Sequence, residues 1–210
     1  MNVRQITYTA LAAWFAAVFT LGMAGAFVTP AGAPPLPILV GATLPLFVFA
    51  AAYAGPSRFR ELVLSADLRL LVGLQAWRAG GLGFLALYAQ GLLPGIFAWP
   101  AGLGDIAIGV TAPWIVRALV LDRAYAGSRG FATWNALGVL DLIIAVGTGA
   151  ASGSLLAGYT GGVDTSPMTH LPLVLIPTFF VPLFIMLHAV AFLQAAVLHR
   201  SGHFITRPYA

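Results

Sequence analysis

Long apolar stretches alternate with short connectors along most of this 210-residue chain. About 20 consecutive apolar residues cross the hydrocarbon core of a bilayer as an α-helix. Six stretches fit that length, and the connectors between them hold the glycine and proline residues that break helices. The pattern therefore predicts six membrane-spanning helices, at about residues 6–28, 36–54, 68–90, 97–119, 131–151 and 171–198.

The composition favours the same fold class. Hydrophobic residues make up 60% of the chain, charged residues only 8%, and the mean hydropathy is +0.94. Soluble domains carry about 25% charged residues. We therefore expect an all-α, polytopic integral membrane protein. Residues 1–210 would form a single transmembrane domain, with the lipid bilayer as its main partner.

The arginines are distributed unevenly over the predicted connectors. All ten basic residues are arginine, and the net charge is +4. With six spans, one side of the membrane receives Arg4, Arg58, Arg60, Arg69, Arg117, Arg123, Arg129, Arg200 and Arg207. The opposite connectors, 29–35, 91–96 and 152–170, contain none. The positive-inside rule then predicts both termini in the cytoplasm of a bacterial cell, with the bundle in the inner membrane, and no binding of nucleic acid.

Several chemistries are excluded by residue types that the sequence lacks. Without cysteine there are no disulfides and no thiolate metal sites, and without lysine no Schiff base can form with retinal or pyridoxal. Zinc or di-iron sites need several closely spaced histidine or carboxylate ligands, and no such spacing occurs. His188 is the one histidine deep in a span, which argues against a bis-histidine haem and leaves a single-histidine haem open. No cofactor is assigned.

Ionisable side chains inside the predicted spans are the main candidates for function. Each costs roughly 2.5–3.5 kcal/mol on insertion scales, so such groups face the bundle interior and have partners. At a rise of 1.5 Å per residue, four of them from four helices fall within a layer about 10 Å thick. The candidate ligand or proton-pathway residues are Arg78, Asp105, Asp141 and His188, with Gln75 and Asn135 as lesser members.

Helical spacing predicts where the two acids point. Asp105 shares a face with Ala101 and Gly109, and Asp141 shares one with Ala145. Small residues allow helices to approach closely in lipid, so both acids should point into the bundle. We expect Arg78 within about 4–6 Å of at least one of them, the range in which opposite charges favour each other.

Two charge states would balance this layer. In the first, Arg78 and a protonated His188 offset two ionised aspartates. In the second, His188 is neutral and one aspartate keeps its proton. The two states differ by one proton, and histidine titrates near neutrality, so a proton-linked switch is one hypothesis. A structural ion pair that fixes helix packing is the other.

Three functions fit this layer. The first is a small transporter or an ion or proton pathway built around a polar site, completed by a homo-oligomer. The second is a binding protein or enzyme for an apolar ligand (a quinone, isoprenoid, pigment or haem). The third is a structural subunit of a larger membrane complex. For the second, the cavity-lining aromatics would be Trp77, Phe84, Tyr88, Trp134, Phe179, Phe180 and Phe184.

Local features add smaller predictions. Ser65 or Asp67 can cap the third helix, and Trp99 and Trp134 are the clearest candidates for anchors at the membrane interface. Pairs of small residues, Ala13 with Ala17 and Gly149 with Gly153, are candidate contacts between copies. Residues 55–67 are expected to form a connector without a helix of their own. Kinks are expected at four prolines inside spans, namely Pro45, Pro113, Pro177 and Pro182.

Overall fold

The computed structural model describes residues 2–30, 32–156 and 159–200, with the backbone alone at 199–200. Helices dominate these residues, and six segments of the described chain are long and apolar enough to cross a membrane, which confirms the predicted number. These are α1 (Val3–Met23), α2 (Leu36–Ala54), the continuous segment Leu68–Ala89, α6 (Gly95–Leu121), α7 (Arg129–Gly153) and the segment that ends in α8 (Val181–Arg200).

Two of these segments change their helical type along their length. The third consists of α4 (Leu68–Leu74), a 3₁₀ stretch η1 (Gln75–Gly81) and α5 (Leu82–Ala89). The last begins with a π-helical turn, η5 (Ile176–Phe180), which contains Pro177 and leads into α8. Short helices also occur in the connectors, among them α3 (Ser57–Leu64), η2 (Arg123–Gly127) and η4 (Ser166–Thr169).

The first and last spans differ from their predicted bounds for local reasons. The first helix starts earlier because Asn2 and Gln5 form a capping box, in which each side chain accepts a hydrogen bond from the other residue's backbone N–H. It ends by residue 23, and Gly25 follows with a φ of +68°, a conformation that ends helices. The last span starts at residue 176 instead of 171, because the chain forms turns before it.

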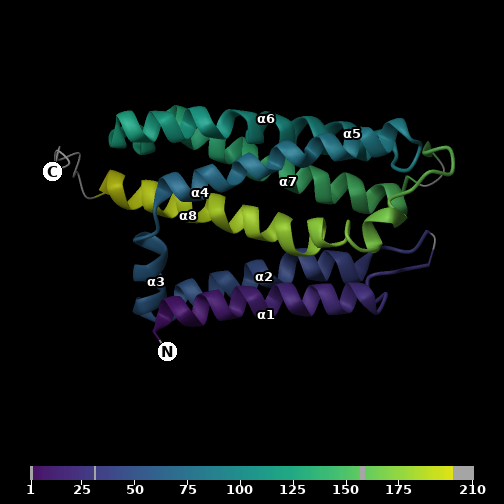
Figure 1. The fold of residues 1–210 in the computed structure, drawn as a ribbon, viewed down its shortest axis with the longest axis horizontal. Coiled ribbons are helices and arrows are strands. Elements are labelled where there is room, and N and C mark those ends of the chain that lie inside the picture. Colours follow the sequence, from purple (N-terminus) through teal and green to yellow (C-terminus); the bar gives the residue numbers. More distant parts are fainter. Residues whose placement is uncertain (1, 31, 157–158, 201–210) are drawn as a thin grey trace.

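The helices run roughly antiparallel along one long axis (Figure 1). In this view α8 lies between the α1–α2 pair and the group formed by α4, α5, α6 and α7. Contacts of α8 with both α2 and α7 agree with that position. The start of α1 and the end of α8 lie at the same end of the bundle, as an even number of spans requires.

The described arginines other than Arg78 gather at this end. Arg4 opens α1, Arg69 opens α4, Arg117 lies in the last turns of α6 and Arg123 opens η2. Arg58 and Arg60 belong to α3, and Arg129 opens α7. Two arginines of the predicted set are not covered, since Arg207 and the side chain of Arg200 lie outside the described residues.

A short helix, α3, occupies the connector expected to lack one. It lies across the end of the bundle, near the start of α1 (Figure 1). Val63 on this helix is buried, whereas Arg58 is exposed. Gln194 of α8 anchors its end, because the side-chain amide donates to the carbonyl oxygens of Val63 and Ala66, each at 3.0 Å. The helix has only eight residues, too few for a periodic pattern to stand out in the sequence.

Asp67 caps the third span, as predicted. Its carboxylate accepts a hydrogen bond from the backbone N–H of Arg69 at 2.9 Å and pairs with the guanidinium of Arg69 at 2.8 Å. The side-chain hydrogen bond from Arg69 lowers the pKa of Asp67 to about 2, so this cap stays ionised throughout the physiological pH range. The start of α4 is therefore fixed independently of the buried site deeper in the same span.

The middle of the third span packs unusually closely on α6. A Cβ atom added to Gly81 would lie 2.5 Å from the Cβ of Asp105, and one added to Gly109 would overlap the backbone of Arg78 and Ala79. Only glycine permits such an approach of two helices. A 3₁₀ stretch inside a longer helix often marks a functional hinge, and here it carries the buried arginine.

Candidate functional site

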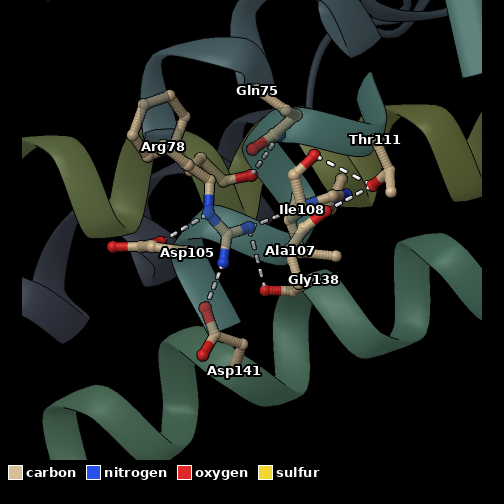
Figure 2. Close-up of polar contacts among 10 residues, drawn as sticks. Gln75, Arg78, Asp105, Ala107, Ile108, Thr111, Gly138 and Asp141 are labelled. Carbon is tan, nitrogen blue, oxygen red and sulfur yellow. Dashed lines mark hydrogen bonds and ion pairs between the residues drawn. The ribbon is translucent and has the colours of Figure 1, made fainter. Parts of the chain in front are cut away.

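Arg78 lies at the centre of the buried polar layer, and only 2% of its surface is exposed. Its Nε donates to Asp105 Oδ1 at 2.7 Å, and its Nη2 donates to Asp141 Oδ2 (Figure 2). The predicted pairing of Arg78 with an acid is thus confirmed, and it involves both acids. The planar guanidinium suits this role because its fixed fork of donors can bridge two carboxylates.

The remaining contacts of the guanidinium extend the site to four spans. Nη1 donates to the carbonyl oxygen of Gly138 at 3.1 Å, as Figure 2 shows, and also contacts Nε2 of His188 at 3.2 Å. Arg78 therefore joins its own span to α6 through Asp105, to α7 through Asp141 and Gly138, and to α8 through His188. The four ionisable residues predicted to share a layer do come together.

The hydrogen bonds around His188 fix its protonation. The side-chain N–H of Asn135 donates to the carbonyl oxygen of Phe131 at 2.9 Å, so Asn135 Oδ1 faces the histidine. His188 Nδ1 lies 2.8 Å from that oxygen and must donate to it, because Oδ1 is an acceptor only. His188 Nε2, 3.2 Å from a guanidinium nitrogen, must then accept. We infer the neutral tautomer of His188 with its proton on Nδ1.

This tautomer favours the charge state in which His188 is neutral and one of the two aspartates keeps its proton. A proton on Nε2 would point at the cationic guanidinium of Arg78. With His188 neutral, one positive charge faces two carboxyl groups, and Asp141 and the side chain of Asp105 are largely buried. An uncompensated buried charge is strongly unfavourable. Electroneutrality is reached when one carboxyl group holds a proton.

Gln75 and Asn135, the two uncharged residues of the polar layer, are both buried, and each exposes 1% of its surface. Asn135 orients His188, as described above. The side-chain amide of Gln75 donates to the carbonyl oxygen of Phe184 at 3.3 Å. Gln75 Oε1 is buried and has no hydrogen-bond partner among the described residues. Gln75 thus ties η1 to α8 beside the charged groups.

Small residues seat the charged side chains, as the helical spacing predicts. Ala101 is fully buried on the same face of α6 as Asp105. Two glycines matter as much: a Cβ on Gly104 would overlap the carboxylate of Asp141, and one on Gly138 would overlap the ring of His188. Nothing in a single sequence separates Gly104 from the many other glycines in the chain, since its value lies in a contact between helices.

Trp134 is part of this site and not an interfacial anchor, which corrects the prediction. Only 8% of its surface is exposed. Its indole N–H donates to Thr111 Oγ1 at 2.8 Å, and its ring packs edge-on against the imidazole of His188, with the ring centres 5.4 Å apart. Thr111 in turn donates to the carbonyl oxygen of Ala107 at 2.6 Å (Figure 2). Trp99, by contrast, is 47% exposed, as an interfacial residue would be.

A cleft of about 90 Å³ reaches Asp105 from the connector end of the bundle opposite the arginines. Its mouth is formed by Thr29 and Pro30 after α1 and by Asp164 before η4. Its walls come from α2, α5, α6, α7 and η5. By volume it holds roughly six water-sized groups, at about 15 Å³ each.

The opposite side of the site is filled by a buried apolar cluster. Ile108, Ala112, Phe131 and Val72 belong to it and pack around Trp134. They come from the third span, α6 and α7. Asp105 is therefore reached from the cleft, while apolar side chains separate the polar layer from the arginine-rich end.

The aromatic residues proposed to line one cavity do not converge. Phe84 lines the cleft, but Trp77 is 79% exposed, and Phe179 packs against Trp14 of α1. Both ring nitrogens of His188 are engaged in hydrogen bonds, so neither is available to a haem iron in this arrangement. In the described chain, no three histidine or acidic side chains lie close enough together to hold a metal ion.

The candidate contacts between copies lie in different places. Gly149 and Gly153 line the cleft and thus face the interior. Ala13 and Ala17 are exposed on α1. A homo-oligomer stays a prediction, and of these two pairs only the one on α1 is available for it.

Comparison with protein families gives a match over most of the chain. Residues 35–196 match a family described as a domain of unknown function, DUF8737. The chain belongs to this family. The match spans α2 to α7 and most of α8, so it contains every residue of the polar site and leaves α1 outside. Comparisons with curated proteins and with solved structures give no match.

Proposed function

We propose that this member of the DUF8737 family is a small membrane transport protein that moves protons through the carboxyl groups of Asp105 and Asp141. One observation carries the proposal: a single buried guanidinium faces two carboxyl groups, and one of these opens onto a cleft. A structural pair needs one acid for each arginine. Here a second acid is present, and Asp105, which lines the cleft, is the group that can take up and release a proton.

Proton movement in this proposal follows the geometry of the site. A proton enters through the cleft and reaches the carboxyl group of Asp105. Arg78 lies between the two acids and can pair with either, so the proton can reside on Asp105 while Asp141 is ionised, or the reverse. Release toward the arginine-rich end requires the apolar cluster around Trp134 to open, and the 3₁₀ stretch and the π-turn are the places where the spans can bend.

The alternatives fit the geometry less well. A binding protein or enzyme for an apolar ligand would need the aromatic residues to surround one cavity, and they do not. A structural subunit would need no cleft leading to a buried acid. Transport therefore explains the second acid and the cleft together.

We further propose that the termini face the cytoplasm and that the bundle lies in a bacterial inner membrane, because the arginines gather at the end that holds the start of α1. The cysteine-free chain suits a labelling test with single exposed cysteines. In intact spheroplasts, a membrane-impermeant maleimide should modify Tyr159→Cys but not Ser57→Cys until the cells are lysed. Labelling of Ser57→Cys alone in intact spheroplasts would reverse the orientation.

Proton flux into proteoliposomes tests the proposed function. A potassium gradient with valinomycin sets a membrane potential, and a trapped pH-sensitive dye reports proton entry. The wild-type protein should acidify the lumen faster than protein-free liposomes do. Asp105→Asn and Asp141→Asn should each remove this excess flux, because an amide cannot exchange a proton at this site.

The matched control is Asp122→Asn, which makes the same chemical change at the exposed cap of α6. Asparagine also caps helices and turns, so the fold should be unaffected. Flux through Asp122→Asn should equal that of the wild type. Wild-type flux no greater than that of empty liposomes, or flux that survives both site substitutions, would refute the proton pathway.

A further inference from the structure

The charged side chains lining the cleft are all acidic among the described residues. Asp105 lies at its inner end and Asp164 at its mouth, and no arginine or histidine is among the lining residues. A concave surface with charge of one sign concentrates ions of the opposite sign. The cleft is therefore suited to a cation.

Arg78 does not offer an anion site here. Its side chain is 1% exposed, it does not line the cleft, and each of its three nitrogen atoms already donates to a partner within the site. An anion entering the cleft would meet the carboxyl group of Asp105 before the guanidinium. The carboxyl group of Asp105 thus faces the cleft, whereas the guanidinium of Arg78 lies behind it, away from the cleft.

The walls of the cleft favour a cation with an apolar surface. Most lining residues are apolar, and two of them, Phe84 and Phe97, pack edge to face with ring centres 5.3 Å apart. Aromatic rings attract ammonium groups, and proteins that recognise quaternary ammonium ligands use this attraction. Phe97 and Asp105 lie on one face of α6, eight residues or about 12 Å apart, so a cation passes the rings on its way to the carboxylate.

We propose that the cleft binds a small monovalent organic cation of the ammonium type, which competes with the proton for Asp105. This inference rests on the proposed proton pathway. When the cation binds, the proton held by the acid pair leaves, so one positive charge replaces another and the buried site keeps its balance. A volume of about 90 Å³ suits a small ammonium ion.

Equilibrium dialysis of radiolabelled tetramethylammonium against the purified full-length protein tests this inference. Tetramethylammonium is permanently charged, so it cannot cross a membrane as a free base or release a proton itself. We expect saturable binding that weakens as the pH falls, because the proton and the cation compete. Pivalate and tert-butanol, an anion and a neutral molecule of similar size, should not displace it.

Matched variants locate the binding. Asp105→Asn should weaken binding at least tenfold, and Asp122→Asn should leave it unchanged. Phe97→Leu, which keeps the wall apolar and removes the ring, should weaken it about two- to fivefold. If Asp105→Asn does not fold, the pH dependence of binding to the wild type still decides. Binding that is the same at all pH values, or displacement by pivalate, would overturn the inference.

The outcomes separate this inference from the proposed function. Proton flux that depends on Asp105 and Asp141, combined with no binding of tetramethylammonium, refutes the cation site and leaves the proton pathway standing. Cation binding at Asp105 in a protein with no proton flux above that of empty liposomes supports the site and refutes the pathway.

Discussion

Replacing Arg78 with methionine should lower the free energy of unfolding by about 3–5 kcal/mol. Methionine fills a similar volume but leaves the carboxyl groups of Asp105 and Asp141, together with the carbonyl oxygen of Gly138 and Nε2 of His188, without their common donor. A loss of this size is a large fraction of the stability of an ordinary domain. We therefore expect little folded protein after purification.

The thermal unfolding midpoint in detergent measures this effect, and two further variants identify its cause. Arg78→Lys keeps the charge but has a single ammonium group, which cannot reach all four partners, so its midpoint should fall between those of the wild type and Arg78→Met. The triple variant Arg78→Met/Asp105→Asn/Asp141→Asn removes the unpaired acids and should recover part of the loss. An Arg78→Met protein as stable as the wild type would show that the network contributes nothing to the fold.

The sequence predicts the spans and the polar layer because both follow from one-dimensional rules. Segment length against bilayer thickness gives the number of helices, and depth along each helix places Arg78, Asp105, Asp141 and His188 in one layer. The same rules give the inward direction of the acids, since Gly109 and Ala101 share a face with Asp105. Each of these predictions uses only the length and residue spacing of a single helix.

What the sequence could not predict depends on contacts between helices. The 3₁₀ stretch that presents Arg78 lies where Gly81 and Gly109 let two helices approach closely, and the helical spacing gives no sign of that change in helix type. The tautomer of His188 depends on how Asn135 is held by Phe131. The cleft is formed by segments far apart in the chain, so Asp164 at its mouth resembles any other polar residue of a connector.

The prediction for Trp134 was wrong for a related reason. Tryptophan near the end of a span is typical of an interfacial anchor. Here Thr111 of the neighbouring helix supplies an acceptor for the indole N–H, and the ring then packs on His188 inside the bundle. A tryptophan can be buried wherever its N–H finds a partner, and the partner lies on another helix.

The second large effect concerns the proton held by the acid pair. With His188 neutral, Arg78 balances one carboxylate, so the other carboxyl group should carry a proton at neutral pH. Removing either acid changes the balance: in Asp105→Asn, Asp141 alone faces Arg78 and should be ionised, and in Asp141→Asn the same holds for Asp105. Each single substitution should therefore abolish the protonated carboxyl group completely, although only one of the two acids carries it at any moment.

Infrared spectroscopy of the protein in lipid nanodiscs tests this central claim most directly, because a protonated carboxyl group has its own carbonyl-stretch band that shifts in heavy water. The wild type and the control Asp122→Asn should show the band at neutral pH, and it should be missing from both Asp105→Asn and Asp141→Asn. A wild-type spectrum without the band, or a band that persists in both site variants, would contradict the shared proton.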